Sequence, residues 1–350
     1  MTNSQGTESV NDKLLAPGVS VVLCCHNSAD VIVPTVRALA AQPVPSGSGY
    51  EVVLVDNNCS DGTVSLAQEA WNGGRAKNPL RIVKESAPGL IHARKKGVSH
   101  ARYDILLFVD DDNVLARGGV STLLSLYRRH PQAAGIGGRI EPLFQGDKPA
   151  WFDQFAGVFA CTPPGQEADL PAVRRSMKGA GLSFRTRGLL SLFHSSLPLF
   201  LVGRKGEALS RGEDSEICLR LCLQGGELRY EPSFRLQHFL KKDRLNWDYV
   251  LRARRWYGKA DVLLKIYKEL VDGHAPLPFG IRRQQAERQI EKLQATAGDA
   301  RSFSDEGSRH ALTYNYFLGL LEGLLELGEV RFEAMRESIV NFYAKSLDVK

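Results

Sequence analysis

The most informative stretch of the sequence is DILLFVDDDN, residues 104–113. Its five apolar residues, Ile105 to Val109, are typical of a strand buried on both faces, as in the centre of a helix-covered parallel sheet. Three carboxylates follow at once, and like charges this close need a compensating cation. A hard divalent ion, Mg²⁺ or Mn²⁺, would supply it and would also hold substrate phosphates. From this stretch alone, a solvated turn in which Asp112 or Asn113 caps a helix explains the residues equally well.

Strands and helices alternate before this stretch. Apolar runs predict strands at Val19–Cys25, Tyr50–Val55 and Leu80–Lys84. Helical spacing follows each of them, over Val31–Ala41, up to about Trp71 with Ser60 or Asp61 as its cap, and over Gly89–Ala101. The alternation predicts an α/β fold of Rossmann-like type, with a mainly parallel sheet covered by helices.

Polar residues follow three of these strands. They are His26-Asn27, Asp56-Asn57-Asn58 and Asp110-Asp111-Asp112. Ligands of such sheets bind beyond the carboxyl ends of the strands, so a shared cleft is expected there. Three unrelated turns, rich in Asn and Asp for ordinary reasons, are the alternative.

Two later segments could face the same cleft. The long loop that follows Ile140 and continues to Pro171 holds Trp151, Phe152, Phe155 and Phe159, which could form an acceptor-side wall or simply pack in the core. Glu213 and Asp214 precede a helix at Ile217–Leu223, so they could act in catalysis or merely favour the helix dipole. Strands are also predicted at Leu228–Tyr230 and Phe234–Phe239.

Composition and charge limit the kinds of partner and the cellular location that we expect. The chain has 350 residues and a net charge of +6, with basic residues concentrated in Arg235–Lys259. This favours an anionic substrate or membrane surface as a partner, and no nucleic-acid-binding motif is visible. The spacing of the six cysteines indicates reduced thiols, and no signal-peptide core is present, so we expect a cytoplasmic protein. We expect a disordered leader over 1–17, a catalytic domain over 18–245 and a helical region over 246–350.

Five motifs in order resemble those of a known family. They are His26-Asn27, Val55–Thr63, Gly89–Arg94, Asp110-Asp111-Asp112 and Gly212-Glu213-Asp214. The set resembles a family 2 glycosyltransferase of the GT-A fold, inverting and of bacterial type, over about residues 18–245. This resemblance implies the GT-A fold with a helical C-terminal extension.

The resemblance also implies roles for individual residues. Asp214 matches the general base, and Asp110 and Asp112 match the D-x-D pair that binds the metal and the donor. His238 sits where some relatives place a further metal or phosphate contact. The remaining donor-side positions are His26, Asn27, Asp56, Asn58, Asp61, Arg94 and Asp111. On the acceptor or sugar side stand Gly181, Glu213 and Trp151.

The implied reaction is metal-dependent transfer of a hexose, with inversion, from a nucleotide sugar to an acceptor hydroxyl. UDP is the first choice of nucleotide, and the acceptor would be a glycan or lipid-linked molecule of cell-envelope polysaccharide or glycoconjugate synthesis. The basic C-terminal helices could touch the inner face of the plasma membrane, or form a solvated face. Two alternatives stand beside this hypothesis: a haloacid-dehalogenase-like phosphatase using Asp110 and Asp112, and a catalytically silent sugar-nucleotide-binding module.

Overall fold

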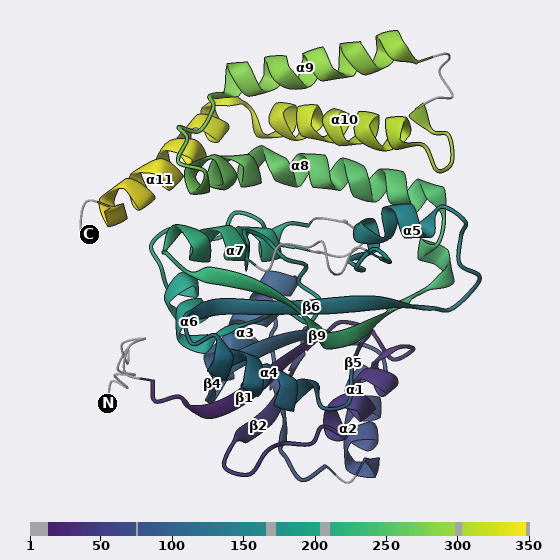
Figure 1. The fold of residues 1–350 in the computed structure, drawn as a ribbon, viewed down its shortest axis with the longest axis vertical. Coiled ribbons are helices and arrows are strands. Elements are labelled where there is room, and N and C mark those ends of the chain that lie inside the picture. The colour runs from purple at the N-terminus through teal and green to yellow at the C-terminus, as the bar shows by residue number, and fades with distance from the viewer. Residues whose placement is uncertain (1–12, 75, 166–172, 204–210, 298–302, 348–350) are drawn as a thin grey trace.

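A sheet lies beneath a layer of long helices (Figure 1). The computed structural model describes residues 13–74, 76–165, 173–203, 211–297 and 303–347. Of the leader expected over 1–17, residues 1–12 lie outside the described residues, and the first strand already begins at Ala16.

The sheet is mixed and mainly parallel. Its described strands are β1 (Ala16–Cys25), β2 (Gly49–Asp56), β3 (Leu80–Lys84), β4 (Tyr103–Asp110), β5 (Asn113–Leu115), β6 (Ala133–Phe144), β7 (Val173–Arg174), β8 (Ser183–Arg185) and β9 (Glu227–Leu240). The order is β3-β2-β1-β4-β8-β6-β9-β5, and β7 pairs with β9. The strands β3, β2, β1 and β4 are parallel, as are β6 and β9, whereas β8, β5 and β7 pair antiparallel. The sequence-based prediction of an α/β fold with this sheet is confirmed.

Helices cover both faces of the sheet and continue beyond it. They are α1 (Ile32–Ala40), α2 (Thr63–Gly73), α3 (Leu90–His100), α4 (Gly119–Arg129), α5 (Phe152–Phe155), η1 (Ala156–Phe159), α6 (Thr186–Phe193), α7 (Glu213–Leu223), η2 (Lys242–Arg244), α8 (Trp247–Val271), α9 (Phe279–Thr296), α10 (Arg309–Leu327) and α11 (Glu329–Leu347). The predicted helical C-terminal extension therefore corresponds to α8 to α11.

The structure excludes one alternative and corrects one prediction about local structure. Asn113 does not cap a helix: it begins β5, opposite His238 of β9. The two strands expected around Tyr230 and Phe234 form one strand, β9, whose register with β6 shifts between Glu231 and Arg235. A Pro at position 232 resembles a strand boundary in the sequence, but an irregular stretch of ladder accommodates it.

The register brings acidic residues to one edge of the sheet. On one side of β1, Cys25 is level with Asp56 of β2, and on the other, Cys24 is level with Asp110 of β4. Since all three strands are parallel, their carboxyl ends open on the same side. The sheet thus delivers these polar ends to one place.

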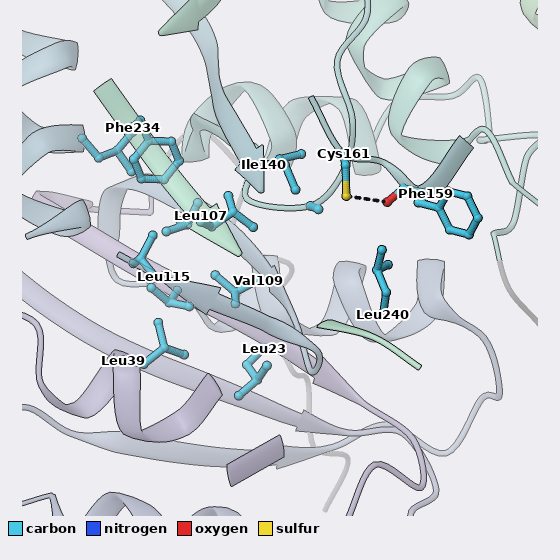
Figure 2. Close-up of a cluster of buried hydrophobic side chains, with 14 of the residues drawn as sticks. Leu23, Leu39, Leu107, Val109, Leu115, Ile140, Phe159, Cys161, Phe234 and Leu240 are labelled. Atoms are coloured by element: carbon cyan, nitrogen blue, oxygen red, sulfur yellow. Dashed lines mark hydrogen bonds between the residues drawn. The ribbon is translucent and has the colours of Figure 1, made fainter. Parts of the chain in front are cut away.

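The central strands are buried on both faces, as predicted from their apolar runs. Val21 and Leu23 of β1 join a cluster with α1, α2 and α4, while Val22 joins a cluster on the opposite face with α3, α6 and α7. Figure 2 shows part of the first cluster, in which Leu23 and Val109 lie together and Phe159 lies farther along the same core. Such alternation fixes the strand register, because a slip by one residue would exchange the two faces.

The long helices form a third apolar cluster, built around α7, α8, α9, α10 and α11. Within it, α8 and α10 approach so closely that a Cβ on Gly258 would lie 2.0 Å from the carbonyl oxygen of Tyr316. A Cβ on Gly319 would lie 1.9 Å from that of Arg255. Among the described residues, no helix is long and apolar enough to cross a membrane.

The contact between α8 and α10 yields a stability prediction. Gly258→Ala should lower the free energy of unfolding by about 1–3 kcal/mol, because the added methyl group meets main-chain atoms that cannot move aside. Gly280→Ala in the first turn of α9 is the control, since nothing lies within 4 Å of its Cβ position. The control should be neutral or slightly stabilising. Urea unfolding measures both, and equal stabilities would contradict the close packing.

Candidate active site

A cavity of about 420 Å³ opens at the carboxyl edge of the parallel strands. The ends of β1, β2 and β4 and the start of α3 form one side of it, and the start of α7, the turn before β8 and the inner face of α8 form the other. The end of β9 and η1 complete the wall. The expected shared cleft therefore exists, and it is wider than the strand ends alone because α8 contributes to it.

The acidic turn after β4 lines this cavity. Asp112 is nearly buried, and its Oδ2 lies 3.5 Å from Nε2 of His238 and 3.3 Å from Nη1 of Arg244. Burial would lower the pKa of His238, but Asp112 outweighs burial and raises that pKa to about 10. Asp112 therefore faces two cations from the end of β9 and the short helix η2.

Asp111 points back into the fold. Its carboxylate accepts a hydrogen bond from the hydroxyl of Ser28, and its main-chain oxygen accepts one from Thr35 of α1 at 2.9 Å. Burial, together with the charges of Asp112 and Asp110, raises the pKa of Asp111 to about 7. Asp111, the central residue of the three, thus anchors the turn to the segment after β1 and to α1.

A buried arginine joins the two sides of the cavity. The guanidinium of Arg94 lies 3.1 Å from Oε1 of Glu213 and 3.7 Å from Oδ1 of Asp110. It also lies over the ring of Phe108, 5.0 Å from its centroid. Arg94 is only 3% exposed, so this charge is largely shielded from water. One cation therefore links the acidic turn of β4 to the start of α7.

Glu213 and Asp214 are adjacent but differ in environment. Glu213 is buried against Arg94, and burial raises its pKa to about 7 although Arg94 opposes the rise. Asp214 is half-buried, and its two carboxylate oxygens accept hydrogen bonds from the main-chain N–H groups of Gly179 (2.7 Å) and Ser215 (2.8 Å). Asp214 is thus the more accessible carboxylate, held in one orientation toward the cavity.

Gly179 lies between Arg94 of α3 and Asp214 of α7. A Cβ at this position would lie 3.0 Å from Nη2 of Arg94 and 3.1 Å from Oδ2 of Asp214. Only a residue without a side chain leaves this approach unobstructed.

The ends of β1 and β2 are tied together beside the acidic turn. Nδ1 of His26 donates to the carbonyl oxygen of Asn57 at 2.7 Å, and Oδ1 of Asn27 accepts from the N–H of Ser60 at 2.8 Å. Oδ1 of Asn57 accepts from the N–H of Gly89 just before α3. His26, Asn27 and Asn57 line the cavity, as does the start of α3, which has no side-chain cap.

Three donor-side candidates lie outside the cavity lining. Asp56 accepts from the N–H of Cys59 at 2.8 Å and so stabilises its own turn. Asn58 is exposed and donates to the carbonyl oxygen of Ser86. Asp61 accepts from the N–H of Thr63 at the start of α2, although the N-cap residue of that helix is Gly62 and not Ser60 or Asp61 as expected. Their geometry is explained by turn and helix-end hydrogen bonds alone.

Two acceptor-side candidates also lie outside it. Trp151 is buried, packs in a T-shaped contact against Trp247 at 5.4 Å and donates to Glu306 at 2.5 Å. It belongs to the hydrophobic core, so the structure favours the packing alternative for the aromatic loop, although Phe159 of the same loop does line the cavity. Gly181 has a positive φ of 64° and packs beneath Leu236.

Residues 20–182 match the family model described as Glycosyl transferase family 2. The chain belongs to this family. As a family 2 member it is a nucleotide-sugar-dependent glycosyltransferase, and the phosphatase alternative is abandoned.

Individual relatives are distant. The chain is 25% identical over 248 residues to a glucosyl-dolichyl phosphate glucuronosyltransferase of Haloferax volcanii. The match covers 69% of this chain and 75% of that protein. It is 25% identical to the pre-mycofactocin glycosyltransferase of Mycobacterium tuberculosis over 67% of this chain, but spans only 46% of that protein. Among solved structures, the mannosyltransferase PcManGT from Pyrobaculum calidifontis, in complex with GDP-Man and Mn²⁺, shares the fold with a TM-score of 0.52 at 15% identity. That match covers 95% of this chain and 81% of the mannosyltransferase.

The acidic turn of this family 2 enzyme fits a divalent cation held jointly by protein and substrate. Among the described residues, no three His, Cys, Asp or Glu side chains form a group that could hold a metal by themselves. Mg²⁺ commonly takes only one or two carboxylates from the protein and completes its shell with substrate phosphates and water. The carboxylates of Asp110 and Asp112 would therefore be enough protein ligands for such an ion. His238 lies beside this turn, with its Nε2 3.5 Å from Oδ2 of Asp112, and its role as a further metal ligand stays a prediction.

Several residues of the cavity wall were not predicted from the sequence. They are Lys178, Arg211, Arg244, Tyr249 and Tyr257. Arg211 adjoins a recognised motif, and Arg244 lies in the basic stretch 235–259, so local signals existed for these two. The two tyrosines belong to α8, and nothing in its sequence pattern showed that its inner face would close the cavity.

Glu213 gives a pH prediction. The folded protein holds a proton on this carboxyl up to about pH 7, whereas the reference value for a free Glu is 4.5. Between these values the folded state binds more protons than the unfolded chain, so the stability contributed by this group falls as pH rises. Relative to Glu213→Gln, the wild type should lose roughly 1–3 kcal/mol between pH 5 and pH 7 and little above pH 8. Urea unfolding at each pH checks this, and a difference that does not change with pH would contradict it.

Proposed function

We propose that the protein is an inverting hexosyltransferase that moves a sugar from a nucleotide sugar, with UDP as the first choice of nucleotide, to the hydroxyl of a glycan or lipid-linked acceptor. The proposal rests on one observation: Asp110 and Asp214 line opposite sides of the same cavity, and Arg94 with Glu213 connects them. A synthesis step in cell-envelope polysaccharide or glycoconjugate formation is the pathway class that we propose.

The donor would occupy the side formed by the strand ends. Asp110 and Asp112 would hold a divalent cation, which when bound neutralises the diphosphate and makes it a better leaving group. The uncapped start of α3 presents main-chain N–H groups to the same space, which suits phosphate oxygens. His26 and Asn27 would border the nucleoside, and Asp56, Asn58 and Asp61 would support this edge through their turns.

The acceptor hydroxyl would lie beside Asp214. A hydroxyl is a weak nucleophile, and a carboxylate that takes its proton accelerates attack by about 10²- to 10⁴-fold. Two main-chain donors fix the Asp214 carboxylate and leave lone pairs for this proton. Direct attack on the anomeric carbon from the side opposite the diphosphate would invert its configuration.

Localisation remains a proposal. All six cysteines are free, which supports a reducing compartment such as the cytoplasm. On the outer face of α8, Arg255 pairs with Glu322, and Lys259 pairs with Glu326 at 2.6 Å. Much of the basic charge there is already balanced, which favours a solvated face over contact with an anionic membrane surface.

Replacing the proposed base should separate binding from chemistry. We expect Asp214→Asn to reduce sugar transfer at least about 10²-fold while nucleotide affinity stays within a factor of about three, since the amide keeps the shape but cannot take the proton. Asp248→Asn is the matched control, because Asp248 lies in the first turn of α8, is exposed and does not line the cavity.

Transfer is measured with nucleotide-sugar donors, and donor hydrolysis without acceptor is measured with Mn²⁺ and with chelator. Turnover by Asp214→Asn equal to that of the control would remove Asp214 from the base role. A wild-type protein that binds donor but neither hydrolyses nor transfers it would instead favour the silent binding module.

Replacing Asp112 should remove the metal dependence of donor binding. Calorimetry should show that the wild type binds UDP more tightly with Mn²⁺ than with chelator. In Asp112→Asn, the affinity for UDP in the presence of Mn²⁺ should be about 10- to 100-fold lower than in the wild type. The asparagine keeps the shape of the side chain, and circular dichroism confirms folding. An unchanged metal effect in this variant would count against the proposed cation site.

A further inference from the structure

The two sides of the cavity differ in how their cations are balanced. On the donor side, Arg94 pairs with Glu213, Arg244 with Asp112, and Lys241 with Asp30 at 2.6 Å. On the opposite side, Arg211 and Lys178 line the cavity, and neither forms a salt bridge with a carboxylate among the described residues. The acceptor side thus holds two cations that have no salt-bridge partner among the described residues.

Arg211 is held in place by neutral groups. Its Nη2 donates to the hydroxyl of Tyr249 at 2.7 Å, and its Nη1 donates to the hydroxyl of Tyr257 and to the carbonyl oxygen of Val158, each at 3.1 Å. These contacts fix the guanidinium, and none of the three groups is a carboxylate that would balance its charge. A cation held this way in a partly dry cavity attracts an anion more strongly than one in water.

Lys178 extends the positive region. Its Nζ lies 5.3 Å from the centroid of the Tyr257 ring, and Arg211 lies 5.2 Å from the same centroid. Burial alone would raise the pKa of Tyr257, but the charges of Lys178 and Arg211 outweigh burial and lower it. The two cations therefore both lie close to the Tyr257 ring. The side chain of Lys178 is exposed and so able to reach a ligand.

This region adjoins the proposed base. Gly179, which follows Lys178, donates its N–H to Asp214, and Arg211 precedes Asp214 by three residues at the start of α7. An anionic group held by Lys178 and Arg211 would place a neighbouring hydroxyl within the space that Asp214 faces.

We propose that Lys178, Arg211 and the hydroxyl of Tyr257 form an anion subsite for the acceptor, and that the acceptor carries a phosphate group close to the hydroxyl that receives the sugar. A phosphate matches the site because it brings up to two negative charges to two cations, and because arginine and lysine both bind its oxygens. A carboxylate would supply one charge only. This inference rests on the proposed function for its orientation in the cavity.

Binding of small probes tests the subsite without knowledge of the natural acceptor. Glucose 1-phosphate, methyl glucoside and methyl glucuronide are titrated calorimetrically into the full-length protein, alone and with UDP and Mn²⁺ at saturation. We expect the phosphate to bind at least about tenfold more tightly than the neutral glycoside and more tightly than the carboxylate, also when UDP is bound. Equal affinity for the neutral glycoside would overturn the subsite, and equal affinity for the glucuronide would overturn the preference for phosphate.

Variants of Lys178 assign the effect to this wall. Lys178→Ala should weaken glucose 1-phosphate binding about tenfold with and without UDP, whereas Lys178→Arg should retain most of it. Lys292→Ala, which removes the same charge from the exposed face of α9, is the control and should change nothing. Unchanged phosphate affinity in Lys178→Ala would overturn the inference even if UDP binds as the proposed function requires. Failure of UDP to bind would count against the proposed donor side alone, since the Lys178 comparison is also made without nucleotide.

Discussion

The buried guanidinium of Arg94 is the interaction on which the rest of the site depends. The sheet brings an acidic turn to its edge, and α7 brings two further carboxylates toward that turn, so the approach of these charges would be unfavourable without a cation between them. Arg94 supplies it from α3, between Asp110 and Glu213. The contact joins elements from distant parts of the chain, and it makes the two walls of the cavity parts of one electrostatic unit.

The same arrangement separates the duties of adjacent carboxyls. Glu213 meets the arginine in a dry environment, whereas Asp214 turns toward the cavity and is held by main-chain N–H groups. Asp111 and Asp112 differ in a comparable way: one is tied to Ser28 and Thr35, and the other faces His238 and Arg244. Neighbouring residues with one chemistry thus acquire different environments from the direction in which the backbone points them, which is how enzymes commonly assign distinct roles to paired acids.

The fold could be predicted from sequence because its signals are local. The apolar run of β4, its acidic end and the strand–helix alternation before it each appear within a few residues, and together they specify the parallel half of the sheet. Tertiary packing is not local in this sense. An aromatic residue such as Trp151 has the same sequence signature whether it lines a cavity or fills a core, and an acid such as Asp61 serves a turn as readily as a ligand. Tyr249 and Tyr257 were missed because their role depends on where α8 lies, which the pattern of α8 itself does not show.

The crossing of α8 and α10 gives this helix an architectural meaning. At Gly258 and Gly319 the two main chains meet without intervening side chains, so their spacing is set by backbone atoms. One face of α8 packs closely in the helical stack, while the opposite face places Tyr249 and Tyr257 in the cavity wall. The α8 helix is therefore part of the cavity wall and part of the helical stack at once. Because backbone atoms fix the crossing, a displacement of the outer stack would move α8 as well. The tyrosine hydroxyls, and Arg211 bonded to them, would then shift relative to the sheet.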